Sequence, residues 1–307
     1  MTQDKTALHG WLIIDKPVGP GSTDIVSKAK RALRDGGYAK VKVGHGGTLD
    51  PLASGVLPVA LGEATKLSGR MLDADKVYDF TIRFGVETDT LDMEGKVVRE
   101  AALPLAGAVW KALSAMQGPI SQVPPAYSAL KVDGTRAYDL ARSGVSVELA
   151  ARDVVIHDIY STDRLGNAVD SARIGEAHLR ASVSKGTYIR SLARDIAEAA
   201  GSVGHVTALR RIKAGPFNTI QAISLDSLAE LAKARTLEQA LLPLKAGLDD
   251  IPALALTPDQ AGALRQGRPV IGIAKTPGLY FATAQSVPVA LVQSDGIEVK
   301  VVRGFNL

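Results

Sequence analysis

The residues best suited to chemistry lie in one loop, VGHGGTLDPLASG at residues 43–55. Asp50 stands directly before Pro51 and five residues after His45, and the loop holds four glycines. A residue before proline is kept in extended backbone, and glycine lets a ligand approach the main chain closely. The loop therefore presents one carboxylate on a stiff turn, where it can act as a nucleophile or take a proton. A plain turn is the alternative for an Asp-Pro pair.

The same loop does not match the glycine-rich loops that cradle nucleotides. It lacks the third glycine of G-x-G-x-x-G and the Gly-Lys-Ser/Thr ending of a P-loop. The chain has no cysteine, which excludes disulfides, thiolate metal sites and cysteine nucleophiles. Its five histidines do not stand at metal-ligand spacing on one helix. The sequence thus predicts chemistry with no metal and no cofactor.

Charge is distributed unevenly along the 307 residues, whose net charge is +4. Residues 24–48 hold six basic residues against two aspartates, and residues 180–215 hold seven against two acidic residues. Residues 224–259 reverse the sign, with six acidic residues against three basic ones. The two basic blocks predict a basic face for an anionic partner such as nucleic acid, and solvated helix faces are the alternative.

The N-terminus lacks the apolar core of a signal peptide, and no apolar run approaches the roughly 18 residues of a membrane span. We therefore expect a cytoplasmic protein with no membrane partner.

Apolar periodicity predicts the elements that position the loop. A helix with buried Ile25, Ala29 and Leu33 is expected to begin at a cap formed by Ser22 or Thr23. Further helices are expected at residues 188–200 and 225–234, and strands at residues 11–15, 56–61, 77–84, 96–98, 154–159 and 179–184. Because strands and helices do not alternate strictly, a doubly wound parallel sheet is disfavoured and the predicted fold class is α+β.

A connector punctuated by proline and glycine follows the 225–234 helix. Beyond it, Thr257-Pro258 begins a short helix that is expected to stop before Gly267. Alternating segments at residues 279–284, 287–292 and 297–302 predict a small β-barrel-like module, with Asp295-Gly296 as a hairpin turn. We therefore expect two domains, at residues 1–247 and 248–307.

The segment GHGGTLDPLASGVL at residues 44–57 closely resembles the catalytic motif of the bacterial tRNA pseudouridine-55 synthases, the TruB family. Gly46 and Ser54 stand where that family usually has threonine, and both changes leave Asp50 and the glycine spacing intact. Other segments resemble the family's remaining motifs in the family's order: GWLIIDKPVGPGS at residues 10–22, KVYDF at 76–80, GVETDTLDMEG at 85–95, QVPPAYSALKVDGTRAYDLAR at 122–142, SKGTYIRSLARDI at 184–196 and GHVTALRRIKAGPF at 204–217.

The resemblance implies a mixed, mainly antiparallel sheet flanked by helices, followed by a PUA-like RNA-binding β-barrel. It implies that residues 1–247 form a catalytic domain that isomerises uridine 55 in the T-arm loop of tRNA to pseudouridine after the base is flipped out. Asp50 would then carry the chemistry, Arg190 would hold the carboxylate ionised, and Tyr78 would stack on the base.

Other positions that match the family are implied to contact the RNA. His45, Tyr188 and Leu209 match residues that line or brace the uridine site. Five basic residues are candidate contacts to the RNA backbone: Lys66, Lys185, Arg210, Arg211 and Lys213. The implied partner is tRNA, no obligate protein partner is expected, and assistance in tRNA folding is a second role of the same surface.

Two other functions are open at this point. An RNA-binding chaperone for tRNA would survive loss of Asp50 but weaken when basic residues such as Arg210 and Lys213 are neutralised. A guide-dependent synthase within a ribonucleoprotein is disfavoured by the TDT segment at residues 88–90, and activity on bare tRNA would exclude it. The sequence also leaves open whether Asp50 attacks a carbon atom or removes a ribose proton.

Overall fold

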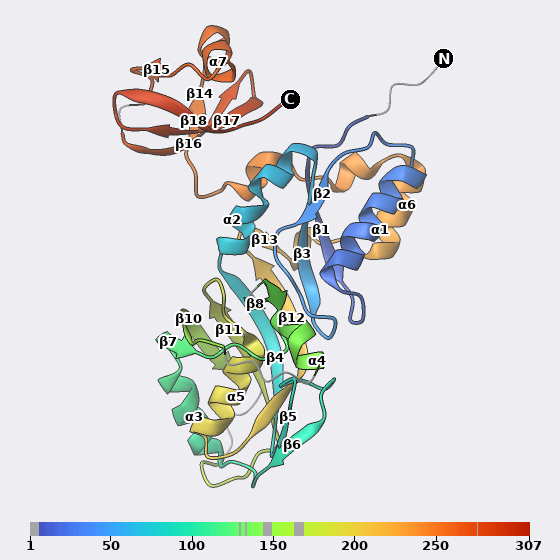
Figure 1. Cartoon of the computed structure of the whole chain (residues 1–307), viewed down its shortest axis with the longest axis vertical. Coiled ribbons are helices and arrows are strands. Elements are labelled where there is room, and N and C mark those ends of the chain that lie inside the picture. The colour runs from blue at the N-terminus through green and yellow to red at the C-terminus, as the bar shows by residue number, and fades with distance from the viewer. Residues whose placement is uncertain (1–5, 129, 133, 144–148, 163–168, 275) are drawn as a thin grey trace.

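The computed structural model describes residues 6–128, 130–132, 134–143, 149–162, 169–274 and 276–307. Two separate sheets organise these residues (Figure 1). The motif at residues 122–142 includes positions 129 and 133, which lie outside the described residues. In the described part of the chain, no helix is long and apolar enough to cross a membrane.

Within the described residues, the larger sheet has nine strands in the order β1-β3-β12-β4-β11-β10-β7, with β2 paired to β3 and β13 paired to β12. The pair β3 with β12 is parallel and the other pairs are antiparallel, which confirms the predicted α+β class. The strands are β1 (Gly10–Lys16), β2 (Val43–His45), β3 (Ser54–Leu61), β4 (Lys76–Phe84), β7 (Gly118–Gln122), β10 (Arg152–Ser161), β11 (Glu176–Val183), β12 (Gly204–Ala214) and β13 (Phe217–Asn218).

Two smaller ladders accompany this sheet. They pair β5 (Val86–Thr88) with β6 (Val97–Glu100), and β8 (Lys131–Val132) with β9 (Thr135–Arg136), which leads into the short helix α4 (Ala137–Arg142). The strand predicted at residues 96–98 is β6, which begins one residue later than predicted, and its partner β5 was not predicted.

Helices bury their apolar sides in one core on a single face of the nine-stranded sheet. Helix α1 lies beside α6, and α3 lies beside α5 (Figure 1). Two residues of the loop between β2 and β3, Leu49 and Ala53, are buried in this same core. The helices are α1 (Ser22–Asp35), α3 (Ala106–Ala115), α5 (Ile189–Ala199) and α6 (Leu225–Ala234).

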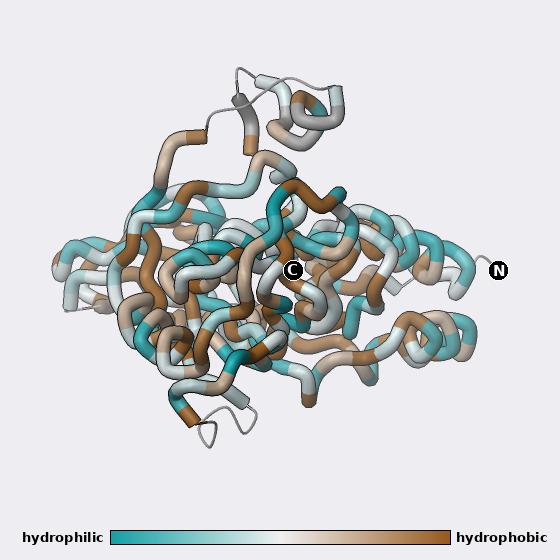
Figure 2. The backbone as a smooth tube through the Cα atoms, turned by 90° about the horizontal axis from the view of Figure 1, so that it is seen from below, coloured by the Kyte–Doolittle hydropathy of each residue, from teal (hydrophilic) through white to brown (hydrophobic). Residues whose placement is uncertain are grey.

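The opposite face of strands β4, β11 and β12 is polar. On β4, Phe80 and Ile82 enter the core, whereas Asp79, directly before Phe80, points to the other face and pairs with Arg180 of β11 through two contacts of 2.6 and 2.8 Å. This alternation follows from the two-residue period of a strand. Figure 2 shows that hydrophobic and hydrophilic stretches are both short and follow one another along the tube.

The cap of α1 differs from the prediction. Neither Ser22 nor Thr23 caps the helix; the cap position is Gly21, whose backbone N–H donates to the carboxylate of Asp24 at 2.9 Å. The hydroxyl of Ser22 is used elsewhere, because it accepts from the backbone N–H of Leu49 at 2.8 Å and donates to the Leu49 carbonyl at 3.1 Å. A contact between distant segments thus displaces the local capping preference.

The C-terminal region forms a second sheet in the order β14-β16-β17-β18-β15 with α7 packed on it, which fits a PUA-like module. Gln285 and Ser286 join β16 to β17 with φ values of 49° and 67°, the backbone of a tight hairpin turn. The elements are β14 (Ala253–Ala255), α7 (Pro258–Arg265), β15 (Val270–Ile271), β16 (Gly278–Ala284), β17 (Val287–Ser294) and β18 (Glu298–Gly304).

A shared apolar cluster joins the two sheets. Trp11 and Phe217 of the larger sheet pack at 5.4 Å between ring centroids, and Phe281 and Phe305 of the smaller sheet join the same buried cluster. Phe305 follows β18 directly and is almost completely buried. The C-terminal module is therefore anchored through the face of β1 that is opposite to the helix-covered core.

The substitution Phe305→Ala tests this anchor. Truncating a buried phenylalanine removes apolar contacts and leaves a cavity, so we expect the free energy of unfolding to fall by about 3 kcal/mol or more. Urea unfolding followed by tryptophan fluorescence measures the loss, since Trp11 lies in the same cluster. Leu307→Ala, a change at a half-exposed residue two positions away, is the control and should cost less than about 0.5 kcal/mol. Equal losses would contradict the anchor.

Candidate active site

A buried lysine at the end of β1 holds the loop that carries Asp50. The ammonium group of Lys16, at the end of β1, donates to the carbonyls of Pro17, Pro20 and Pro51 at 2.9, 2.7 and 3.3 Å. Lys16 is 0% exposed, and its three donors are all used. Burial lowers the pKa of Lys16 to about 8, and the nearby charge of Asp50 opposes this shift. The turn at Asp50-Pro51 is therefore fixed to the first strand.

A buried arginine holds the other side of the loop. Arg211 of β12 donates from Nη1 to the carbonyl of Thr48 at 3.2 Å and from Nε to the carbonyl of Val56 at 2.8 Å. Gly55 has a φ of 102°, and a Cβ there would lie 2.2 Å from the Arg211 carbonyl. The close approach of β3 and β12 therefore requires glycine at this position.

Gly46, one of the two departures from the family motif, also has a steric explanation. A Cβ at this position would lie 2.6 Å from Cβ of Met71, in α2 (Ser68–Asp73). The buried side chain of Met71 fills the space that a side chain at position 46 would need. As the loop is placed here, position 46 therefore has no room for a threonine side chain.

The sheet and helices bring Asp50 and Arg190 together as an ion pair. Arg190 is the second residue of α5, and its Nη2 lies 2.9 Å from Oδ2 of Asp50. The guanidinium also donates to the carbonyls of Thr90 and Tyr127, both at 2.9 Å. The Arg190 side chain is 7% exposed, whereas that of Asp50 is 40% exposed. A buried, oriented guanidinium therefore pairs with an accessible carboxylate and fixes its position.

A second carboxylate, Asp92, faces the other side of the same guanidinium. Its Oδ2 lies 3.4 Å from Nη1 of Arg190, and its side chain is 4% exposed. The other oxygen of Asp92 accepts from the hydroxyl of Thr90 at 2.5 Å and from the backbone N–H of Glu94 at 3.0 Å. Asp92 thus compensates the buried charge of Arg190 and fixes its orientation.

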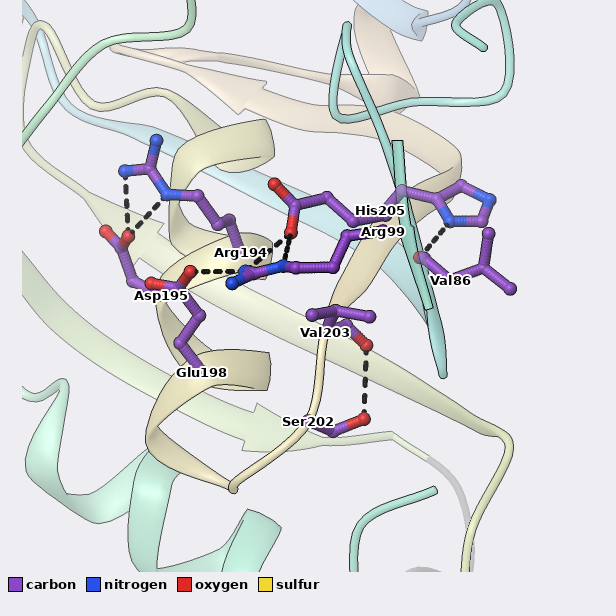
Figure 3. Close-up of polar contacts among 9 residues, drawn as sticks. Val86, Arg99, Arg194, Asp195, Glu198, Ser202, Val203 and His205 are labelled. Carbon is purple, nitrogen blue, oxygen red and sulfur yellow. Dashed lines mark hydrogen bonds and ion pairs between the residues drawn. The ribbon is translucent and has the colours of Figure 1, made fainter. Parts of the chain in front are cut away.

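The β5–β6 hairpin, whose loop contains Asp92, is also fastened to α5 away from the site (Figure 3). Arg99 of the hairpin lies 2.6 Å from Glu198 of α5, and its Nε donates to Glu87 at 2.8 Å. The helix that carries Arg190 and the loop that carries Asp92 are therefore joined at two points.

A cavity of about 320 Å³ opens beside the ion pair. Of the six residues predicted for catalysis or for the uridine site, five line it: Asp50, Tyr78, Tyr188, Arg190 and Leu209. They come from the loop, from β4, from the start of α5 and from β12. A concave site of this size can enclose a small ligand such as a nucleoside. The structure thus brings together residues that are up to 159 positions apart, between Asp50 and Leu209.

Tyr188 is fixed at the cavity wall by its own backbone. Its N–H donates at 2.8 Å to the side-chain carbonyl of Gln122, a buried residue at the end of β7. Burial raises the pKa of the Tyr188 phenol, so this group stays protonated at neutral pH. His45 lies in β2, half-buried, and is not among the described residues that line the cavity. Burial lowers the pKa of His45 and favours the neutral imidazole.

The predicted contacts to the RNA backbone are spread over different surfaces. Lys185 is exposed, stands between two residues that line the cavity, Ser184 and Gly186, and pairs with Asp73 at 3.1 Å. Lys66 pairs with Glu63 at 2.7 Å and donates to the carbonyl of Gly304 at 2.8 Å, at the junction with the C-terminal module.

The three candidates on β12 lie in different environments. Arg210 makes a two-point contact with Asp15, at 2.9 and 2.8 Å, and is not among the described cavity residues. Lys213 is exposed beside a separate hollow of about 520 Å³. Arg211 is 1% exposed, so it does not fit the expectation of a surface contact. Its donors face the loop that carries Asp50, because β3 and β12 adjoin there.

The sequence reasoning missed several residues that build the site, including Lys16, Asp92 and Gln122. Two further cations line the cavity without having been predicted: Lys76 and Arg152. Lys76 donates to the carbonyls of Leu72 and Ala74, and burial lowers its pKa to about 8. Each of these residues except Arg152 lies inside a motif already recognised from the sequence, and that motif was the available signal.

Solved structures place this architecture in a known class. The chain aligns with a chain from an H/ACA ribonucleoprotein bound to a substrate RNA containing 2′-deoxyuridine, with a TM-score of 0.71, 24% identity and coverage of 97% of this chain and 86% of that one. It also aligns with a chain of a Cbf5–Nop10–Gar1 complex, with a TM-score of 0.70, 26% identity and coverage of 97% and 85%. The fold is that of the pseudouridine synthases.

Family models and curated relatives give a closer assignment. Residues 34–189 match the N-terminal domain of the TruB family pseudouridylate synthases, and residues 190–249 match the tRNA pseudouridylate synthase B C-terminal domain. Proteins named tRNA pseudouridine synthase B from Novosphingobium aromaticivorans and Zymomonas mobilis are 59% and 56% identical, over 98% of this chain and 98% and 97% of theirs. The chain belongs to the TruB family of pseudouridylate synthases. It is therefore an isomerase that forms pseudouridine from uridine.

The substitution Asp92→Asn tests the positioning role of the second carboxylate. Asparagine keeps the shape but removes the charge that faces Arg190, and a hydrogen bond to a charged group contributes about 1.5–3 kcal/mol. We expect kcat to fall by about 10- to 100-fold with KM nearly unchanged, measured as pseudouridine formed per enzyme. Asp89→Asn is the control, since Asp89 lies in the same loop and accepts from the backbone of Lys96 instead. Wild-type kcat in Asp92→Asn, or an equal loss in the control, would refute this role.

Proposed function

We propose that this chain converts uridine 55 in the T-arm loop of tRNA to pseudouridine. The observation that carries the proposal is the ion pair of Asp50 with Arg190 beside a cavity of about 320 Å³. The names of the relatives at 59% and 56% identity supply the class of substrate, tRNA. A base can enter such a cavity only after it leaves the RNA stack, so the proposal includes base flipping.

The reaction exchanges one bond to the ribose for another. The bond from C1′ to N1 of uracil breaks, and a bond from C1′ to C5 of the turned base forms. C5 loses its proton and N1 gains one, so no oxidant, reductant or water is consumed. Asp50 would begin the sequence, either by attack on a carbon atom or by removal of a ribose proton. Both routes need a carboxylate that is oriented and open to the ligand, and the contact with Arg190 and the 40% exposure of the Asp50 side chain support this.

The aromatic and apolar residues of the cavity suit a flipped pyrimidine. Tyr78 would stack on the base, and its hydroxyl would handle the proton at C5. Tyr188 and Leu209 would close the site around the ring, since both line the same cavity. His45, on the strand that leads into the loop, would brace the space that the uridine leaves in the RNA.

The charge of the cavity suits the backbone of the flipped nucleotide. The described lining contains one carboxylate, Asp50, and four cations: Lys76, Arg152, Arg190 and Arg211. Arg190 is compensated by Asp92, but the surplus positive charge attracts a phosphodiester. Lys185, next in sequence to two lining residues, would add an exposed cation, although it pairs with Asp73 in the free protein.

We also propose that the two parts of the chain have different functions. Residues 1–247 would act as the catalytic domain, because they contain all the residues of the ion pair and cavity. Residues 248–307 would act as a PUA-like RNA-binding domain, and the separate five-stranded sheet supports this assignment. The isolated chain would act on bare tRNA in the cytoplasm, without a guide RNA.

The substitution Asp50→Asn tests the function. We expect the rate of pseudouridine formation on unmodified tRNA to fall by about 10³-fold or more, because the reacting carboxylate is lost. The dissociation constant for tRNA should stay within about twofold of the wild-type value, since the cations remain. Pseudouridine is mapped by position in both the full tRNA and a T-arm hairpin, and product at a position other than 55 would overturn the site assignment.

The same variant separates catalysis from a role in tRNA folding. A chaperone would still accelerate tRNA folding with Asp50→Asn, and an enzyme alone would not. Wild-type turnover by Asp50→Asn would contradict the catalytic assignment, whatever the outcome for folding.

A further inference from the structure

Another hollow, distinct from the candidate cavity and from the hollow beside Lys213, lies next to helix α1. It has a volume of about 1040 Å³ and separates α1 from the chain that returns to β2. We call it the α1 groove. Its lining residues are Ser27, Lys30, Arg31, Leu33, Arg34, Tyr38, Ala39, Lys40, Val41, Lys42 and Val43.

Two rows of exposed cations flank the α1 groove. On the helix, Arg34 stands three and four positions after Arg31 and Lys30, which places these residues on one side of α1. On the extended chain, Lys40 and Lys42 are two positions apart, which places them on one side of that segment. The groove is therefore a channel with positive charge along both edges.

This positive charge is not compensated within the described residues. No carboxylate is among the residues that line the groove, and Lys30, Arg31, Lys40 and Lys42 have no ion pair. Arg34 contacts Asp35 at 3.0 Å, but both side chains are mostly exposed and such a pair contributes little. By contrast, Arg180 is held by an aspartate through two contacts on the polar face of the sheet.

The floor of the groove is apolar and fixed. Leu33, Tyr38 and Val43 are buried. The hydroxyl of Tyr38 donates to Glu238 at 3.1 Å and accepts from the backbone N–H of Leu237 at 3.0 Å. The channel is therefore formed before a ligand arrives, and a ligand need not order it.

The groove is joined to the catalytic loop at both of its walls. Helix α1 begins at Ser22, whose hydroxyl bonds the backbone of Leu49 in that loop. The other wall ends at Val43, where β2 begins and leads directly to the loop. From Ser22 to Arg34 the helix rises by about 18 Å at 1.5 Å per residue. A ligand in the groove thus extends away from the site where the uridine reacts.

We propose that the α1 groove binds the sugar-phosphate backbone of the same tRNA, in a part of the molecule outside the T-arm hairpin that delivers the uridine. This inference rests on the proposed function for the identity of the RNA. Two rows of cations suit one strand of phosphates, which contribute affinity without reading sequence. The distance from the catalytic loop places the bound phosphates beyond the hairpin loop in the cavity. The groove would therefore distinguish a complete tRNA from an isolated hairpin.

The test removes one cation from each row, in the variant Lys30→Gln/Lys40→Gln. The matched control is Lys111→Gln/Lys233→Gln, which removes two exposed helix lysines that have no ion pair among the described residues and do not line the groove. Dissociation constants and kcat are measured for full-length unmodified tRNA and for the T-arm hairpin at several salt concentrations. Thermal unfolding of each variant confirms that the fold is intact.

We expect the groove variant to weaken binding of full-length tRNA by about tenfold or more at 0.1 M salt. The slope of log Kd against log salt should become shallower by about 1.5, since two phosphate contacts are lost. Binding of the hairpin, and kcat on both RNAs, should match the control variant.

An equal loss on hairpin and full tRNA would overturn the proposal, because the groove would then contact the hairpin itself or act only through its charge. An unchanged affinity for full-length tRNA would overturn it too. Failure of the proposed function has a different signature: the wild-type chain would form no pseudouridine at position 55, while the binding measurements would still report on the groove.

Discussion

The guanidinium of Arg190 is the point on which the site depends. It contacts Asp50 of the catalytic loop, Asp92 and Thr90 of the β5–β6 loop, and the carbonyl of Tyr127. A buried cation that loses its partners is strongly destabilising, so these segments are held together by the need to compensate one charge. The ion pair needs the parallel contact of β3 with β12 and the start of α5 to be in place. The fold can be understood as the scaffold that makes this arrangement stable.

Sequence reasoning reached much of the fold and part of the site. Strands and long helices such as α5 and α6 were predicted because their apolar periodicity is local. The convergence of Tyr78 and Leu209 on one cavity could be expected only through the family motifs, since nothing local brings β4 and β12 together. Ser22 was predicted wrongly as a cap because its hydroxyl is taken by Leu49, 27 positions away. The partner of such a hydroxyl depends on long-range packing, which residue types alone do not specify.

The distribution of charge over the fold is consistent with the proposed binding of RNA. On the polar face of the sheet, arginines are matched by aspartates, as Arg210 is by Asp15. Around the catalytic cavity and along the α1 groove, cations exceed the available carboxylates. Uncompensated charge of this kind raises the rate and strength of association with a polyanion. Arg211 shows that a basic block is not all surface, because its side chain supports the catalytic loop from inside.

The most direct test of the central role of Arg190 is the single-turnover rate of Arg190→Lys on unmodified tRNA, measured together with tRNA affinity. Lysine keeps the positive charge but loses the planar group that reaches Asp50, Asp92 and two carbonyls at once. If orientation by the guanidinium is essential, the rate falls by about 100-fold or more while the dissociation constant stays within about twofold. A rate equal to that of the wild type would contradict the role assigned to Arg190.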